Sequence, residues 1–182
     1  MTPRRFVLLD RDGTINVEKE YLSSVEGLEL LPNTVAGLRA MREFGLGLVV
    51  LTNQSGIGRG YFGAEAVDRI HRALAGLLAA GGVSLDGIYV CPHGPEEGCP
   101  CRKPEPGLAE QAARELGFRL ADSFVIGDKA ADIELGRRVG GTSILVRTGY
   151  GREVEAKGVA HPDYIADDLA DAARVIQGIL SG

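Results

Sequence analysis

Residues 6–14 read FVLLDRDGT, an apolar run that ends in two carboxylates, Asp10 and Asp12, followed by a glycine. Four consecutive apolar residues are typical of a strand that is buried on both faces of a parallel sheet. Gly13 permits a sharp turn directly after this strand. The stretch therefore predicts a buried strand whose end carries two acidic side chains into a loop.

Four further apolar runs have the composition of buried strands, and helical patterns separate them. The runs lie at residues 46–51, 87–90, 123–126 and 143–146. Alternating strands and helices indicate a parallel sheet with right-handed crossovers, so we expect a three-layer, doubly wound α/β fold. The ligand crevice of such a fold lies beyond the carboxyl ends of the strands, where Asp10 and Asp12 would lie.

Apolar residues at helical spacing predict three of the helices. We expect the first to begin after Asn33 as its N-cap and to end at Gly45. The third is expected from about Pro106 to Gly117. The apolar stripe of the first comprises Val35, Leu38, Met41 and Phe44, and that of the second comprises Val67, Ile70, Leu74, Leu77 and Leu78, before Gly81. Residues 149–162 are expected to form a longer irregular connection.

Length and charge restrict the classes of function. A chain of 182 residues with 45% hydrophobic residues predicts one domain, residues 1–182, with a core of its own. The net charge of -5 disfavours a nucleic-acid partner, which needs clustered basic residues. The start of the chain, residues 1–9, is too short for a signal peptide or a membrane span, so we expect a cytoplasmic protein with no membrane contact. A monomer is the default, because no coiled-coil pattern is present.

All three cysteines of the chain lie in one short segment. Cys91-Pro92-His93 and Cys99-Pro100-Cys101 place three thiols and one imidazole within residues 91–101, which suits a closed tetrahedral zinc site. The alternative is three free thiols in a reducing compartment. With no open coordination position, the zinc would be structural and would fix Arg102 and Lys103, which follow directly.

Two other interpretations of the loops are weaker. Calcium-binding loops also begin with an Asp-x-Asp pattern like that of Asp10 and Asp12. In this chain, however, Gly13 comes too early for such a loop, and no bidentate glutamate follows at the required spacing. Gly56-x-Gly58 invites a dinucleotide-binding interpretation, but Tyr61 stands in the place of the third glycine. An acidic turn that only caps backbone amides would fit Asp10 and Asp12 if they stood alone.

Three further polar signals sit at or near predicted strand ends: Thr52-Asn53, Lys103, and Gly127-Asp128. In this order, and together with residues 10–14, they resemble the four motifs of the haloacid dehalogenase (HAD) superfamily of phosphatases. The resemblance spans roughly residues 6–150. It implies a HAD-like Rossmannoid sheet and hydrolysis of a phosphate monoester. The intervals between the motifs are too short for a large cap domain, so we expect an open site.

The resemblance also implies roles for single residues. Asp10 would attack phosphorus, and Asp12 would be the general acid and base. A catalytic Mg²⁺ would take side-chain oxygens of Asp10 and Asp128 and the backbone carbonyl of Asp12. Thr52 and Lys103 would hold the phosphoryl oxygens.

A narrower resemblance is carried by residues 10–17, 52–62 and 146–151 and by the Cys/His loop with the Arg102-Lys103-Pro104 that follows it. These stretches resemble the heptose bisphosphate phosphatases of this superfamily, which act in lipopolysaccharide precursor biosynthesis by removing the C7 phosphate. It implies a small phosphorylated sugar as substrate, with Arg102 as reader of the second phosphate. Lys129 and Asp132 would contact the substrate or support the site, and a surface ion pair explains them nearly as well. The expected substrate contacts are Glu18, Lys19, Glu20, Tyr21, Thr52, Asn53, Gln54, Ser55, Arg102, Lys103 and Lys129.

Other functions stay open at this point. A histidinol-phosphate phosphatase shares the zinc loop and all four motifs, although its loop after the second strand resembles Thr-Asn-Gln-Asp-Gly. A catalytically inactive, zinc-stabilised module that binds sugar phosphates would keep the same residues. A phosphomutase normally carries a cap to exclude water. The sugar anomer and the role of Arg59 do not follow from the sequence.

Overall fold

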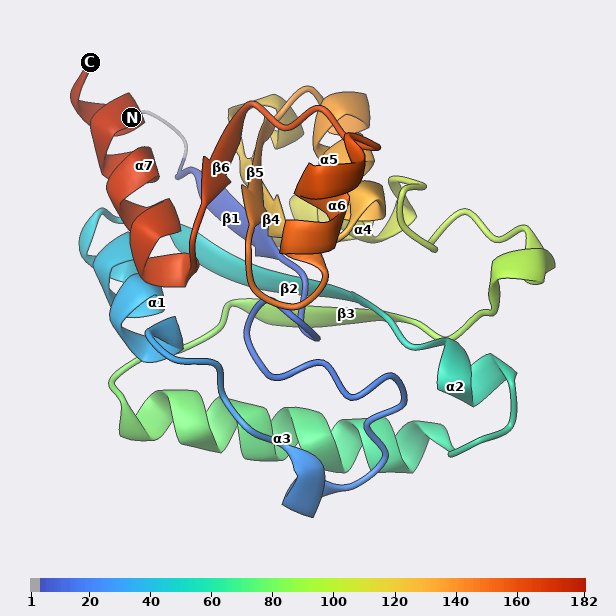
Figure 1. Cartoon of the computed structure of the whole chain (residues 1–182). Coiled ribbons are helices and arrows are strands. Elements are labelled where there is room, and N and C mark those ends of the chain that lie inside the picture. Colours follow the sequence, from blue (N-terminus) through green and yellow to red (C-terminus); the bar gives the residue numbers. More distant parts are fainter. Residues whose placement is uncertain (1–3) are drawn as a thin grey trace.

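A six-stranded parallel sheet forms the centre of the computed structural model, which describes residues 4–182 (Figure 1). Residues 1–3, on which part of the expectation about the start of the chain rests, lie outside the described residues. The strands are β1 (Phe6–Leu9), β2 (Gly47–Asn53), β3 (Gly87–Cys91), β4 (Phe124–Gly127), β5 (Thr142–Val146) and β6 (Tyr164–Ala166). The first five confirm the predicted strands. β6 was not predicted, because its three residues, two of them exposed, are too few to stand out as a buried strand.

Helices precede or follow every strand of the sheet. They are α1 (Thr34–Glu43), α2 (Ser55–Gly58), α3 (Ala64–Ala80), α4 (Gly107–Leu116), α5 (Ala130–Val139), α6 (Gly151–Lys157) and α7 (Leu169–Ser181). Three 3-10 turns lie at Val25–Gly27, Pro95–Glu97 and Leu120–Asp122. The predicted three-layer α/β fold is confirmed.

Two local expectations were wrong, and a third holds in position only. Asn33 is the N-cap residue of α1, as predicted, but its φ is 65° and its side chain donates to Oδ2 of Asp168 at 2.7 Å and makes no capping hydrogen bond. Leu77 is 45% exposed, so the buried stripe of α3 passes beside it through Ile70, Leu74 and Leu78. The segment expected to be irregular contains α6, whose seven residues are too few to show an apolar period.

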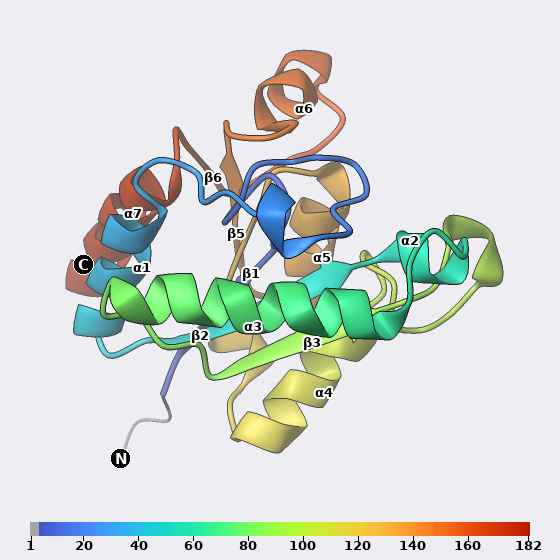
Figure 2. The same cartoon turned by 90° about the horizontal axis from the view of Figure 1, so that it is seen from below.

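Side chains of alternate strand residues pack into two hydrophobic cores, one on each face of the sheet. Val7 and Leu9 of β1 pack in a core to which α1, α3 and α7 contribute. Phe6 and Leu8 pack on the other face, against α4 and α5. Figures 1 and 2 both show α1 lying along α7. Burial on both faces explains why the central strands are continuous apolar runs instead of alternating ones.

The strand order is β3-β2-β1-β4-β5-β6, so the direction of winding reverses between β1 and β4. Ligands of doubly wound sheets bind at this switch point, beyond the carboxyl ends of the strands. The long connection after β1 covers that end of the sheet, and its 3-10 turn packs against α3 (Figure 2). Among residues 4–182, no helix combines the length and the apolar character that a membrane span requires.

Candidate active site

The switch point carries the two acidic residues that follow its strands. Asp10 follows β1, and its backbone N–H donates to the Ile126 carbonyl of β4 at 3.0 Å. Asp128 follows β4 and is fully buried. Its carboxylate lies so close to two glycines that a Cβ at Gly13 or at Gly149 would stand 2.2 Å from Oδ2. Glycine at both positions, each with positive φ, is therefore what lets the loops close over Asp128.

Four oxygen atoms converge here on one cation, the Lys129 ammonium, and one of them is Oε2 of Glu18 at 3.1 Å from Nζ. The other three belong to the aspartates. Nζ lies 3.3 Å from Oδ2 of Asp10, 3.0 Å from the Asp12 carbonyl oxygen and 3.2 Å from Oδ1 of Asp128. These are the oxygens that the superfamily resemblance assigns to Mg²⁺, and an all-oxygen ligand set suits that ion. Burial, together with the Asp10 charge, raises the pKa of Asp128 to about 8, and a divalent cation would offset both effects. The residues present therefore fit a magnesium ion.

A fourth carboxylate, that of Asp132, has another role. Its side chain lies within 4.8 Å of those of Asp10 and Asp128, which makes it an alternative metal ligand. However, its Oδ1 accepts from the Lys103 ammonium at 2.8 Å, and its Oδ2 accepts from the Lys129 backbone N–H at 3.1 Å. Because both oxygens already have protein donors, we prefer the Asp12 carbonyl as the third ligand. Asp132 instead anchors Lys103.

Lys103 is the buried cation of the site. Its side chain is 4% exposed, and Nζ also donates to Oδ1 of Asp10 at 2.9 Å. Burial opposes ionisation of Asp10, but the Lys103 and Lys129 ammonium groups outweigh it and hold the pKa of Asp10 well below its ordinary value. The Asn53 side chain fixes the backbone of Lys103 from both sides, accepting from its N–H at 3.0 Å and donating to its carbonyl at 3.2 Å. Asp10 is thus an anion with an ammonium held against it.

The carboxylate of Asp12 is held by donors from several segments. Nη2 of Arg11 donates to both of its oxygens at 2.8 Å. Asn16 Nδ2 adds a bond to Oδ1 at 3.0 Å, and Gln54 Nε2 adds one to Oδ2 at 2.9 Å. Gln54 also donates to the hydroxyl of Thr52 at 2.7 Å, which leaves the hydroxyl proton of Thr52 free to donate elsewhere.

A cavity of about 420 Å³ opens over these groups. Eight of the expected substrate contacts line it: Glu18, Glu20, Tyr21, Asn53, Ser55, Arg102, Lys103 and Lys129. Three do not, because Thr52 and Gln54 are buried beneath it and Lys19 forms an ion pair with Glu29 at 3.7 Å. The lining also includes Asp10, Asp12, Ala131, Asp132 and Tyr150. Such a cavity suits a small ligand that carries phosphate groups.

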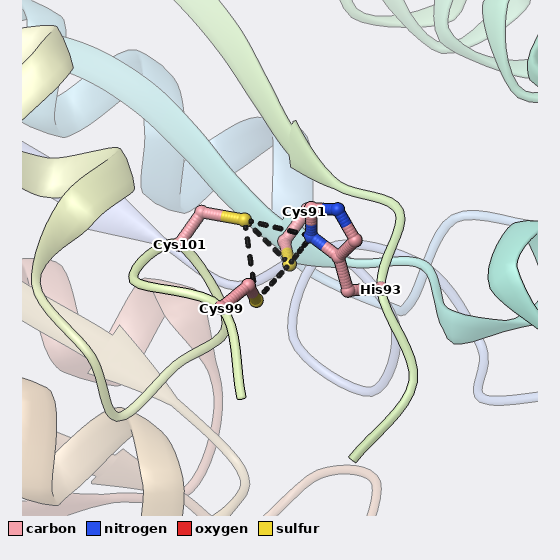
Figure 3. Close-up of side chains that lie close together, drawn as sticks. All are labelled: Cys91, His93, Cys99 and Cys101. Atoms are coloured by element: carbon pink, nitrogen blue, oxygen red, sulfur yellow. Dashed lines mark hydrogen bonds between the residues drawn. The ribbon is translucent and has the colours of Figure 1, made fainter. Parts of the chain in front are cut away.

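Beside the cavity, the predicted zinc ligands Cys91, His93, Cys99 and Cys101 point toward one another (Figure 3). Five of the six distances between their sulfur and Nδ1 atoms are 2.8 to 3.6 Å. A tetrahedron with bonds of about 2.3 Å to sulfur requires edges of roughly 3.7 Å, so small shifts of the side chains accommodate the ion. Burial raises the pKa of Cys91. Burial also opposes ionisation of Cys99, but hydrogen bonds from the Cys101 and Cys91 thiols and from the Arg102 and Cys101 backbone together outweigh it and lower the pKa of Cys99 to about 6. The donor set therefore fits zinc.

Arg102 links this cluster to the cavity, since its Nη1 donates to the His93 carbonyl at 3.2 Å. Removing zinc is therefore expected to displace Arg102 and Lys103 and to lower kcat/KM on the order of tenfold to a hundredfold. The measurement is activity and zinc content of Cys101→Ser beside the unaltered protein, with zinc added back to chelated protein as control. Full activity at zero zinc content would contradict this role.

The sequence analysis missed two residues of this neighbourhood. His71 was interpreted only as a helix residue, but its Nε2 lies 2.9 Å from Nη1 of Arg11. Tyr150 lies at the cavity wall, and its backbone N–H donates to Oδ2 of Asp128 at 2.9 Å. The residues of each pair are far apart in the sequence, so no local pattern connects them.

Comparisons with known proteins give one consistent result. A family model described as HAD-hydrolase-like matches residues 100–172. A D-glycero-beta-D-manno-heptose-1,7-bisphosphate 7-phosphatase of Yersinia pestis is 40% identical over 179 residues, which is 94% of each chain. The protein of the same name in Pseudomonas putida is 38% identical over 93% of this chain and 98% of its own.

A comparison with solved structures also finds a heptose bisphosphate phosphatase. The crystal structure of D,D-heptose 1,7-bisphosphate phosphatase from B. bronchiseptica, complexed with magnesium and phosphate, superposes with a TM-score of 0.90. It is 33% identical and covers 96% of this chain and 99% of that one. A beta-phosphoglucomutase of Clostridium difficile is 13% identical with a TM-score of 0.62, which shows a shared fold alone.

Proposed function

The chain belongs to the family of D-glycero-beta-D-manno-heptose-1,7-bisphosphate 7-phosphatases among the HAD-like hydrolases, and we propose that it removes the C7 phosphate of that bisphosphate through a phospho-aspartate on Asp10. The observation that carries the mechanism is the ring of groups around Asp10. Lys103 donates to one of its oxygens, and the other lies with the Asp12 carbonyl oxygen and Oδ1 of Asp128 around a single cation. This places a nucleophile against the positive charge that a phosphate dianion needs.

The first step transfers the phosphoryl group to the protein. An oxygen of Asp10 attacks phosphorus and the bond from phosphorus to O7 breaks, while Asp12 gives its proton to O7. Bound Mg²⁺ supplies the charge that neutralises repulsion between the carboxylate and the phosphoryl oxygens. Lys103 and the hydroxyl of Thr52 donate to these oxygens. The product that leaves is the heptose 1-phosphate.

The second step regenerates the protein. Asp12, now a carboxylate, takes a proton from a water molecule whose oxygen attacks phosphorus. The bond between phosphorus and Asp10 breaks, inorganic phosphate leaves, and Asp12 is protonated again.

The Lys129 ammonium and a metal ion cannot occupy the same place. With the metal bound, the Lys129 ammonium would therefore lie elsewhere in the cavity and be available to the substrate.

Residues 4–182 contain no large cap domain, so the loops around the cavity have to select the substrate. Glu18, Glu20 and Tyr21 line the cavity on one side, and Arg102 lines it beside the zinc cluster. The beta anomer is the substrate in the names of the relatives, and we extend it to this chain. We place the protein in the cytoplasm, as a monomer, in the synthesis of nucleotide-activated heptose for lipopolysaccharide.

Comparing kcat/KM across four substrates tests the proposed function. The substrates are the beta and alpha anomers of the bisphosphate, histidinol phosphate and a heptose monophosphate, each with Mg²⁺. We expect the beta bisphosphate to be preferred over the others. A preference for histidinol phosphate would overturn the choice of substrate, and binding without turnover would support an inactive module.

Substituting Arg102 tests how the second phosphate is recognised. Arg102→Ala is expected to lower kcat/KM for the bisphosphate by roughly tenfold to a hundredfold, since a charge-assisted hydrogen bond is lost. Turnover of 4-nitrophenyl phosphate should change by less than about threefold. Arg119→Ala, which removes an exposed arginine, is the matched control. Equal losses on both substrates would assign Arg102 a structural role.

A further inference from the structure

Arg11, between the two aspartates of the site, is fully buried although it carries a permanent charge. A guanidinium in the interior is tolerated only when its N–H groups have partners. Nε and Nη2 donate to Asp12, at 3.2 Å and 2.8 Å. Nη1, on the other edge of the fork, has His71 of α3 as its partner at 2.9 Å. The guanidinium therefore bridges a helix to the carboxylate of Asp12.

His71 has the properties of an acceptor for that fork. It is 8% exposed, and burial together with the Arg11 charge lowers its pKa to about 4, against smaller opposite effects of Asp12 and Asp68. The imidazole is thus neutral near pH 7, with the Nε2 lone pair toward Arg11 and its proton on Nδ1. A neutral acceptor satisfies Nη1 without competing with Asp12 for the positive charge.

We propose that His71 and Arg11 are positioning residues for Asp12: α3, through His71, fixes the guanidinium fork that orients the carboxylate of the general acid and base. The inference rests on the proposed function, because it gives Asp12 that task. Asn16 and Gln54 also donate to Asp12, but each donates to one oxygen only, whereas Arg11 donates to both oxygens. Because the guanidinium is planar and His71 holds its far edge, it fixes the orientation of the Asp12 carboxylate as well as its distance from Arg11.

The two steps of the reaction give this role a distinct kinetic signature. A sugar leaving group needs the proton of Asp12, whereas 4-nitrophenolate leaves without it. Hydrolysis of the phospho-aspartate needs Asp12 as base whichever substrate was used. A misplaced Asp12 therefore slows both steps for a sugar phosphate but only the second step for the aryl phosphate. The aryl phosphate should then release product in a burst before a slow steady state.

The test compares His71→Phe, which fills the space but accepts no hydrogen bond, with His71→Gln, which keeps an acceptor. Rapid-quench kinetics with 4-nitrophenyl phosphate should show a burst approaching one product per His71→Phe molecule. Its kcat for the sugar bisphosphate should fall roughly tenfold to a hundredfold. His71→Gln should recover most of the rate. His161→Phe, at an exposed histidine, is the matched control.

Several outcomes would overturn the inference. They are an unchanged His71→Phe, equal losses on both substrates without a burst, or failure of His71→Gln to restore the rate. If thermal unfolding shows that His71→Phe does not fold, Arg11→Lys supplies the second test. Lysine keeps the positive charge but lacks the planar fork, so the Arg11→Lys protein should show the same burst. Failure of the proposed function is distinguishable, because it shows in the unaltered protein, which would then prefer another phosphate ester to the sugar bisphosphate or hydrolyse neither substrate.

Discussion

Replacing Asp10 with asparagine is expected to lower kcat on the order of ten-thousand-fold or more, for every phosphate ester. The amide has nearly the shape of the carboxylate but lacks its anionic oxygen. The side chain still accepts a hydrogen bond from Lys103, so the fold around β1 should survive. What is lost is the bond between phosphorus and residue 10, through which both steps pass.

Steady-state kinetics of Asp10→Asn with the sugar bisphosphate and with 4-nitrophenyl phosphate give the measurement. Asp122→Asn, in an exposed ion pair with Arg119, makes the same chemical change away from the site and should keep full activity. Substrate binding by calorimetry separates loss of chemistry from loss of affinity. Retention of more than about 1% of the activity would show that another group attacks phosphorus.

Replacing Lys103 with methionine is expected to damage both catalysis and stability. The side chain keeps a similar length but loses the ammonium that lies between Asp10 and Asp132. Removing one partner of a buried ion pair typically lowers the free energy of unfolding by about 3–5 kcal/mol, because the remaining charge is buried without compensation. Loss of a donor to the phosphoryl oxygens should lower kcat/KM by roughly a hundredfold to a thousandfold.

Urea unfolding without added magnesium measures the first effect, and turnover of the sugar bisphosphate measures the second. Lys157→Met removes an exposed lysine that pairs with Glu153 and should leave both quantities within error of the unaltered protein. A Lys103→Met protein with ordinary stability and activity would mean that the contacts of Lys103 with the two carboxylates contribute to neither property.

Most of the geometry of the candidate site could be predicted because each group follows a strong local signal. Asp10 and Asp128 each follow an apolar strand, so parallel pairing of β1 with β4 brings the two together. Lys103 follows a zinc loop whose cysteine spacing is readable without any structure. Strand ends and metal-ligand spacings are set by backbone geometry over a few residues, which is why the sequence shows them directly.

The rest depends on contacts between segments that no local pattern connects. His71 lies in an ordinary amphipathic helix, and only the packing of α3 against the loop after β1 places it beside Arg11. Asn33 stands at the N-cap position of α1, yet its side chain bonds to Asp168, the residue before α7, and not to its own helix. The place of the Lys129 ammonium among four oxygens likewise follows from folding, since a surface ion pair explains this lysine nearly as well from the sequence.

The most direct test of the mechanism is to trap the phosphorylated protein. The unaltered protein is mixed with the sugar bisphosphate and Mg²⁺, quenched within milliseconds, treated with borohydride, and its peptides are analysed by mass spectrometry. Because borohydride reduces an acyl phosphate to an alcohol, a phospho-aspartate mechanism predicts homoserine at position 10 and at no other acidic residue. Turnover with position 10 unmodified in every quenched sample, or with the label on another carboxylate, would contradict it.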